Sequence, residues 1–514
     1  MPVMCRRPFR QVRSLRSCRS PTAERQVRMH GVARPELPTR SSVTGLDRRR
    51  LGPLPVLAQS VAAVAPSGAA AIIPAIVLGA TGPGALLAFV CTTVVCMLVS
   101  WCIQQFACRM RAPGGLYSYS ARALHPGGAL VTGWSALLGY AVVAMAGLLA
   151  VGLYLADLAQ RLGAPASIGP PLAAGFVLVA GVTVGVILVA GIRLSARVTL
   201  LVESVSILLV LVVLIMLFVV VLPTADLSAV LAWKPDIRPL AVGIVIAISA
   251  FIGFESATTL SVEAAKPLES VPRAVRWTVP AAGVLYVFSS LVQSVAMPSP
   301  TITHEVTPVT DLVSLHEPMV MSIVLDLAIA ASWFSCALAS LNALVRVLFC
   351  MGREGVVPRG LGHTHPRYRT PSRALAVVLP PVVVTPFVLI LAGAQQHALA
   401  DLLTLSALGY LGTYVVVCVA TPLFLRRIGE ATRASWIVSV TAALLLTVII
   451  ALAIVQTFSE QPVLVSVFLA VLFGSGCLAL VFRRRAPARL AAVGVYDETI
   501  ASDVSRGAQR GIFR

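Results

Sequence analysis

Charged side chains are scarce in this sequence. Of its 514 residues, 58% are hydrophobic and only 12% are charged. A water-soluble chain of this length would fold into several domains, and those domains would need far more polar surface than this composition supplies. The composition therefore excludes a set of soluble domains and predicts that most of the chain lies in lipid.

Several kinds of chemical site are also missing. No G-x-x-x-x-G-K-[ST] motif occurs, which excludes a self-contained ATP-driven pump. The seven histidines all fall outside the long apolar runs, so neither a metal site nor a histidine proton relay is expected within a membrane. Eight of the ten cysteines lie inside those runs or just beyond their inner ends and are expected to pack as small apolar residues. We expect no catalytic residue and no cofactor.

Long apolar runs account for most of the chain. A helix needs about 20 apolar residues to cross a hydrocarbon core of roughly 30 Å. Twelve runs of this length occur, at 54–78, 85–107, 129–156, 172–191, 198–222, 240–260, 279–297, 321–344, 374–391, 402–424, 437–458 and 463–482. They predict an all-α integral membrane protein of about 12 transmembrane helices, with a twelve-helix membrane domain at 54–482.

The basic residues alternate in a way that predicts the orientation. The net charge is +19, but the 40 lysines and arginines are not spread evenly. If the N-terminus is cytoplasmic, the inner loops hold 17 of them, whereas the outer loops hold only Arg161, Lys234 and Arg238. This is the positive-inside pattern, so the charge reflects membrane topology rather than nucleic-acid binding. We expect a multi-pass protein of the plasma (inner) membrane with both termini cytoplasmic.

The loop at 298–318 provides a test of this orientation, because it contains no lysine or arginine. A cysteine introduced at Thr303 is expected to react with an impermeant thiol reagent in intact cells. Labelling that occurs only after lysis would reverse the orientation of the whole chain.

The two ends of the chain carry no apolar periodicity. Residues 1–53 contain 13 arginines and are expected to form a disordered, basic cytoplasmic tail, and Met29 offers an alternative start. Residues 483–514 are expected to form a cytoplasmic C-terminal tail, basic where it leaves the last span. Neither tail is expected to be a folded domain.

Two of the spans contain weak points for a helix. The first is interrupted by "APSGAAAIIP" at 65–74, and the sixth contains "SAFIGFES" at 249–256. Broken helices at corresponding positions of two halves are typical of inverted-repeat transporters, because half-helix ends expose backbone groups that bind substrate and ions. The pattern alone favours this interpretation no more than close helix packing through small residues.

Four stretches carry a resemblance to a known family. They are "APSGAAA" at 65–71, "APGGLYSYSARALHP" at 112–126 followed by "GW" at 133–134, "FIGFESATTLSVEAAKPLESVPRAV" at 251–275 and "SLNALVRVLFCMGREGVVPRGLGHTHPRYRTPSRAL" at 340–375. Together they make the chain from about 54 to 482 resemble the amino acid permeases of the amino acid-polyamine-organocation (APC) superfamily. The resemblance implies two inverted five-helix repeats, helices 1–5 and 6–10 with helices 1 and 6 broken, followed by two accessory helices.

The resemblance also implies roles for particular residues. An unwound segment of the first helix holds the substrate carboxylate, and Ser67, Gly68 and Ala69 match it. The break in the sixth helix receives the amino group, and an aromatic ring covers the substrate side chain. The matching positions are Ala250, Phe251, Ile252, Gly253 and Phe254.

Glu255 is the most informative acid in the sequence. It lies 15 residues beyond Leu240, about 22 Å along a helix that crosses roughly 30 Å. An acid at that depth is a functional candidate, and the resemblance links it to gating and proton response; a structural acid bonded to a neighbouring helix is the alternative. We expect Glu203 and Asp326 near the ends of their spans, within reach of interfacial water.

The coupling ion is left open by the sequence. Ser206 stands where some proton-coupled relatives place a lysine, so no ammonium group can replace a cation there. A sodium site made by first-helix carbonyls with Ser332 and Ser335 is one alternative, and exchange without a coupling ion is another. Glu263, Lys266 and Arg273 are expected to form an inner charge network with Arg346 and Arg353 rather than to contact substrate.

These observations predict a secondary transporter that moves amino acids by alternating access, in contact with lipid and with a coupling proton or sodium ion. Three alternatives stay open: a polyamine or organocation exchanger of the same fold, a facilitator fold of two six-helix halves, and a non-transporting amino acid sensor. The broken first and sixth spans argue against the facilitator fold.

Overall fold

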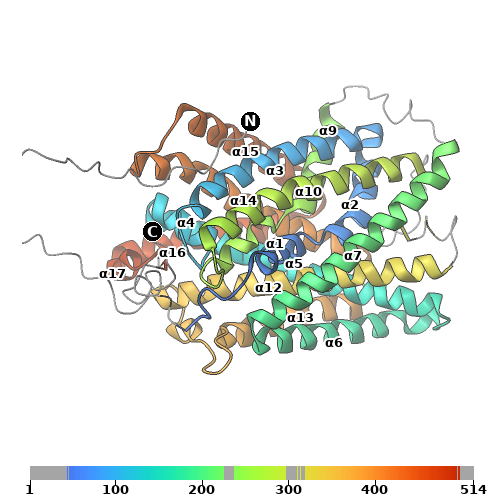
Figure 1. Cartoon of the computed structure of the whole chain (residues 1–514), viewed down its shortest axis with the longest axis horizontal. Helices are drawn as coiled ribbons and strands as arrows, with labels where there is room; N and C mark the ends of the chain where they lie inside the picture. The colour runs from blue at the N-terminus through green and yellow to red at the C-terminus, as the bar shows by residue number, and fades with distance from the viewer. Residues whose placement is uncertain are drawn as a thin grey trace, which may run out of the picture. The chain divides into compact units, whose positions relative to one another are not determined.

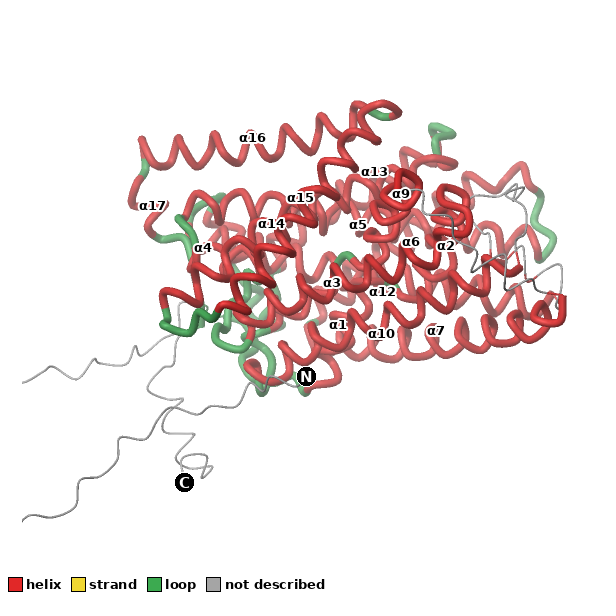
Figure 2. Tube along the Cα trace, turned by 90° about the horizontal axis from the view of Figure 1, so that it is seen from above, coloured by secondary structure: helices red, strands yellow, loops and turns green. Residues whose placement is uncertain are grey.

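A computed structural model describes residues 43, 45–224, 237–296, 309–310, 313, 319–494 and 496–497. Within these ranges the chain is helical and forms no named strand (Figure 2). Residues 42–497 form one compact unit. Most of the loop at 298–318, the N-terminal tail up to residue 42 with Met29, and residues 498–514 lie outside the described residues.

Eleven helical segments among the described residues are long and apolar enough to span a membrane. The first of them, Pro53–Ala107, has 55 residues, which at 1.5 Å per residue would reach about 80 Å, more than twice the hydrocarbon thickness. It consists of α1 (Pro53–Val64), α2 (Pro66–Thr81), a turn at Gly82–Gly84 and α3 (Ala85–Ala107), and it therefore holds two of the twelve predicted runs. The predicted all-α membrane fold is confirmed.

The later helices overlap the other ten runs. They are α4 (Leu116–Ala123), α5 (Pro126–Arg161), α6 (Gly169–Ala190), α7 (Ile192–Val221), α9 (Ile237–Ala247), α10 (Pro267–Ala296), α12 (Met319–Glu354), α13 (Ser372–Leu391), α14 (Gln395–Arg427), α15 (Arg433–Glu460), α16 (Pro462–Arg485) and α17 (Pro487–Ala491). The short helix α4 is not one of the predicted spans. Most predicted ends fall inside the helices, because helices continue through polar turns that hydropathy does not count.

The first span breaks at Ala65. This residue has φ 49° and ψ 56°, a left-handed conformation that ends α1, and α2 begins at Pro66. Proline disfavours helical geometry in the residue before it and has no N–H to donate, so it stops one helix and is well placed to start the next. The local sequence thus accounts for this break.

The sixth span breaks at Ile252 and Gly253. After α9 the chain forms one 3-10 turn, Ile248–Phe251, passes through extended Ile252, and resumes as a second 3-10 segment, Phe254–Leu260. Gly253 has φ 98°, and a Cβ on it would lie 2.7 Å from the carbonyl oxygen of Ala63. Glycine is required here both by the backbone conformation and by the close approach of the end of α1.

The helices run roughly side by side in one bundle (Figure 1). Helix α5 packs against α12 and α14, and these helices are among the most enclosed spans. Helix α16 runs along one side of the bundle (Figure 2), and Val463 and Phe473 on it are largely exposed. Large exposed apolar side chains on outer helices are expected where lipid is the solvent.

The parts of the tails nearest the bundle contact it. Leu51 is buried and pairs with Ala264 in an isolated β-bridge. Beyond α17, the carboxylate of Asp497 lies 2.8 Å from the guanidinium of Arg48, and the N–H of Gly494 donates to Glu354. Residues close to each end of the membrane domain therefore pack on it, whereas the sequence analysis assigned them to tails without structure.

Candidate functional site

The start of α2 presents backbone N–H groups at the first break. Residues in the first turn of a helix have no intrahelical acceptor for their N–H groups. The N–H of Gly68 donates to the hydroxyl of Ser332 on α12, at 3.4 Å. The N–H of Ala69 already donates to the carbonyl of Ala65, at 2.8 Å. Ala69 therefore does not offer the exposed N–H group that was expected of it.

The indole ring of Trp333 covers Gly68. A Cβ on Gly68 would lie 2.5 Å from the Nε1 atom of Trp333, so only glycine leaves room for the ring. The Nε1 atom of Trp333 and the hydroxyl of Ser67 are both buried, and neither has a hydrogen-bond partner among the residues that the structure describes. Buried donors are normally satisfied, and two unsatisfied ones beside a helix N-terminus are groups to which an anion can bind.

Several groups at the second break are bonded within the protein. The carbonyl of Ala250 accepts a hydrogen bond from the hydroxyl of Tyr286, at 2.8 Å, and the carbonyl of Gly253 accepts from the N–H of Ser256, at 2.9 Å. The carbonyl of Phe254 accepts from the hydroxyl of Ser60. Ile252 lies in the extended stretch between the two 3-10 segments, outside any regular helix.

The two aromatic side chains at this break pack against tyrosines. The ring of Phe251 meets that of Tyr286 edge to face, with centroids 5.0 Å apart. The ring of Phe254 lies 5.4 Å from that of Tyr414. Both phenylalanines are buried. In this arrangement they are part of the core, and Tyr286 and Tyr414 are site neighbours that sequence reasoning did not identify.

Glu255 is buried, with 1% of its surface exposed. Its Oε1 atom accepts a hydrogen bond from Tyr140 on α5, at 2.7 Å, and its Oε2 atom accepts one from Tyr414 on α14. The hydroxyl of Tyr414 also lies 3.3 Å from the N–H of Gly253. Glu255 follows the break on a 3-10 segment, so the distance of about 22 Å counted from Leu240 along a regular α-helix does not measure its depth.

Glu203 on α7 is the acid that sequence reasoning placed wrongly. It is 2% exposed, and its Oε1 atom accepts a hydrogen bond from Ser332 at 2.9 Å, whereas its Oε2 atom has no partner within the described ranges. The predicted span began at Val198, but α7 begins at Ile192 and has 30 residues. Glu203 therefore lies about 17 Å along a helix of about 45 Å, close to its middle.

Asp326 is also buried rather than facing interfacial water. One of its carboxylate oxygens accepts a hydrogen bond from Thr310 at 2.8 Å, and the other lies 3.4 Å from the guanidinium of Arg161. It lies near the first turns of α12, as expected, but its partners enclose it.

The three candidate hydroxyls for ion coupling differ in their surroundings. Ser332 joins Gly68 to Glu203 through two hydrogen bonds. Ser335, about one turn further along α12, is buried, and its hydroxyl has no partner among the side chains and backbone that the structure describes. Ser206 is buried on α7, three residues beyond Glu203.

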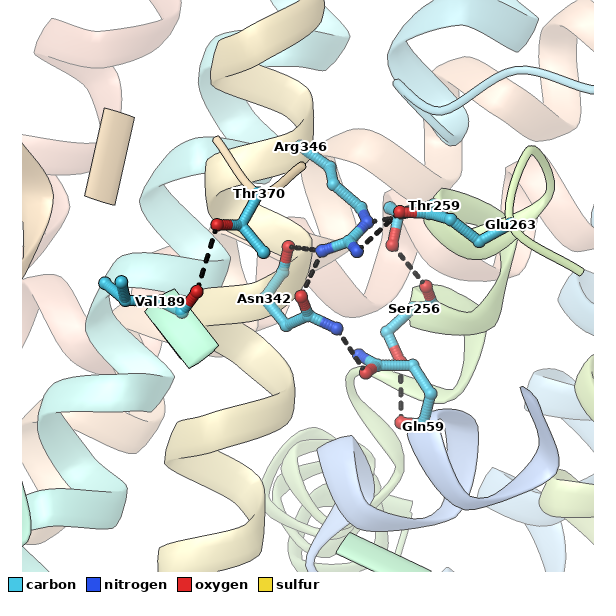
Figure 3. Close-up of polar contacts among 8 residues, drawn as sticks. All are labelled: Gln59, Val189, Ser256, Thr259, Glu263, Asn342, Arg346 and Thr370. Carbon is cyan, nitrogen blue, oxygen red and sulfur yellow. Dashed lines mark hydrogen bonds and ion pairs between the residues drawn. The ribbon is translucent and has the colours of Figure 1, made fainter. Parts of the chain in front are cut away.

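A buried polar network joins α1 to α12 and to the segment after the second break (Figure 3). The side chain of Asn342 donates to Gln59 at 2.9 Å and accepts from Arg346. Arg346 forms an ion pair with Glu263 at 2.7 Å, and the two side chains are 2% and 1% exposed. The hydroxyl of Ser256 donates to the carbonyl of Gln59, at 3.0 Å.

The expected inner charge network is smaller in the structure. Lys266 is exposed and its ammonium lies 3.9 Å from Glu269, while the guanidinium of Arg353 lies over the ring of Phe349. Arg273 is exposed. Of the five charged residues predicted to form this network, Arg346 and Glu263 make a buried ion pair.

Similarity to known proteins identifies the family to which this helical bundle belongs. A model of the amino acid permease family matches residues 56–482. This chain belongs to the amino acid permease family. The match covers nearly the whole length of the described spans, and the chain is a multi-pass membrane protein of this family.

Curated relatives of the permease differ in what they are named for. The branched-chain amino acid permease BcaP of Bacillus subtilis is 23% identical over 56% of this chain and 64% of its own length. The methylthioribose transporter of the same organism is 24% identical over 57% of this chain and 64% of its own length. The low-affinity putrescine importer PlaP of Escherichia coli is 22% identical, over 52% and 60%. Each alignment spans less than two thirds of the relative.

Proposed function

We propose that this permease moves amino acids across the plasma (inner) membrane by alternating access and holds the substrate carboxylate at the break between α1 and α2. The observation that carries the proposal is the set of donors there. The N–H of Gly68 lies in the first turn of α2, beside the unsatisfied hydroxyl of Ser67 and the unsatisfied indole N–H of Trp333. A carboxylate would satisfy such donors, and a helix N-terminus favours negative charge.

The substrate amino group is assigned to the second break. The carbonyls of Ala250 and Gly253 already accept hydrogen bonds, so Ile252 and Phe251 are the better candidates among the positions that resemble the family's amine site. Ile252 is extended and lies between the two 3-10 segments, and a carbonyl at such a break can accept an ammonium proton. A shift of the Phe251 ring or of Trp333 would open space for the substrate.

Alternating access needs elements that move together. The hydrogen bonds from Ser60 to Phe254 and from Ser256 to Gln59 tie α1 to the 3-10 segment after the second break. We assign these two elements to one moving unit, within two inverted repeats formed by spans 1–5 and 6–10. Spans 11 and 12, α15 and α16, are then the accessory helices, and both termini face the cytoplasm.

Glu255 is assigned to gating. Its two tyrosine partners come from α5 and α14, and Tyr414 also reaches Gly253 at the break. Any movement of the second break relative to those helices has to exchange these hydrogen bonds. Glu255 therefore contributes to the free energy of the arrangement in which these hydrogen bonds are formed.

Counterflow in proteoliposomes tests the substrate class. Purified permease preloaded with one amino acid is expected to exchange it for radiolabelled members of an amino-acid panel. Decarboxylated amines should compete about 10- to 100-fold less well, because each hydrogen bond to a charged group contributes about 1.5 to 3 kcal/mol.

The same assay separates the alternatives. Amines that compete as well as amino acids would move the substrate class to polyamines or organocations, a class that includes the diamine for which PlaP is named. Saturable amino acid binding without any counterflow would indicate a sensor instead of a transporter.

A further inference from the structure

Glu203 is linked to the carboxylate site by a single hydroxyl. Ser332 donates to the Oε1 atom of Glu203 at 2.9 Å and accepts from the N–H of Gly68 at 3.4 Å. The Oε2 atom of Glu203 is buried and has no partner in the described part of the chain. Glu203 therefore differs from Glu255, whose two carboxylate oxygens both accept hydrogen bonds.

No cationic side chain of the described residues faces Glu203 from the helices packed against α7. These are α1, α2, α6, α10 and α12. Helices α1, α2 and α6 contain no titratable side chain. Tyr286 on α10 and Cys336 on α12 lie close enough to interact with the carboxylate electrostatically. On α7 itself, Arg193 and Arg197 are exposed near its start.

An ionised carboxylate in such surroundings is costly unless a cation neutralises it. We propose that Glu203 is the proton-binding group of this permease and that Ser332 couples its protonation to binding of the substrate carboxylate. The inference rests on the proposed function, because it requires a substrate carboxylate at Gly68.

The coupling follows from the one hydrogen atom on the hydroxyl of Ser332. When Glu203 is ionised, that hydrogen points to Glu203, and a substrate carboxylate at Gly68 would place a second negative charge beside the same oxygen. When Glu203 is protonated, it can donate to Ser332, whose own hydrogen then turns to the substrate carboxylate. Proton and substrate therefore favour each other's binding.

Such coupling is reciprocal. If a proton raises the affinity for substrate by some factor, substrate raises the affinity for the proton by the same factor, typically about 5- to 150-fold. Proton and amino acid would then cross the membrane together. Glu203, on the fifth span, would then have the role in proton coupling that Ser206 cannot have.

The test uses the full chain in sodium-free proteoliposomes with a pH-sensitive dye in the lumen. For the wild type we expect an inward proton gradient to accelerate amino acid uptake, and substrate addition to acidify the lumen. Glu203→Gln keeps the size of the side chain and the acceptor for Ser332. It should lose substrate-driven acidification and the pH dependence of KM, while counterflow, which needs no net proton movement, stays within about threefold.

Glu255→Gln is the matched control, because it removes the charge of the other buried acid. It is expected to keep substrate-driven acidification and to change only the rate of transport. Ser332→Ala keeps both acids and should reduce the pH dependence of substrate affinity, and it serves as the second variant if Glu203→Gln does not insert.

Three results would overturn the inference. Acidification retained in Glu203→Gln, or lost only in Glu255→Gln, would place the proton elsewhere. Wild-type net uptake that needs sodium, or that proceeds without acidifying the lumen, would reject proton coupling at Glu203 and leave the proposed function intact. A wild type that exchanges no amino acid would overturn the proposed function, and the inference with it.

Discussion

Gly68→Val is expected to abolish transport while the protein still inserts in the membrane. A Cβ at this position would lie 2.5 Å from the indole Nε1 atom of Trp333, so the ring has to move away from the start of α2. The added methyl groups would also fill the path by which a ligand reaches the N–H of Gly68. Loss of two hydrogen bonds to a charged group corresponds to at least about 100-fold lower initial uptake.

Gly79 on the same helix provides the matched control. A Cβ there would meet nothing within 4 Å, so Gly79→Val is expected to insert and transport like the wild type. Initial uptake is compared at equal amounts of inserted protein. If Gly68→Val retains more than about a tenth of wild-type uptake, the carboxylate is not held at this helix end.

Arg346→Leu should strongly destabilise the permease, because it leaves Glu263 buried without its cationic partner. Both side chains of this ion pair are almost completely enclosed, and Arg346 also bonds Asn342 (Figure 3). Removing one partner of a buried ion pair typically costs about 3 to 5 kcal/mol. Equilibrium unfolding in mixed micelles, monitored through helix content, measures the free energy of unfolding.

Two controls show whether burial is the reason. Arg346→Leu combined with Glu263→Leu removes both charges and should recover most of the loss, since an apolar pair needs no compensation. Arg109→Leu breaks an ion pair with Glu430 that is largely exposed, and it should change stability by no more than about 1 kcal/mol. If the Arg346→Leu protein is as stable as the Arg109→Leu protein, the ion pair between Arg346 and Glu263 does not stabilise the bundle.

The membrane architecture was predictable from sequence because it depends on local composition. Twelve apolar runs of spanning length overlap the helices, since lipid forces the backbone to satisfy its own hydrogen bonds. The positions of the two breaks could also be located, although the pattern alone did not decide between broken helices and close packing of small residues. Pro66 acts on the residue next to it, and Gly253 adopts a conformation that other residues rarely adopt.

The ends of the helices were less predictable, and this error affected the site. Hydropathy began the fifth span at Val198, after the polar turn that contains Arg193 and Arg197. The helix begins at Ile192, and those few residues decide whether Glu203 lies at an interface or near the middle of the bundle. A sequence pattern measures the apolar part of a helix, whereas packing determines its full length.

Only the tertiary structure decided which side chains meet. Nothing in the sequence near Gly68 indicates that Trp333 covers it, or that one hydroxyl of α12 joins it to an acid on α7. The partners of Gln59 and Arg346 are likewise far away along the chain. The sequence by itself determined that this chain is a helical membrane protein and located two weak points in its spans. Contacts between distant helices determined the polar chemistry at those breaks, because burial and hydrogen-bond partners depend on how the helices pack and not on their local order.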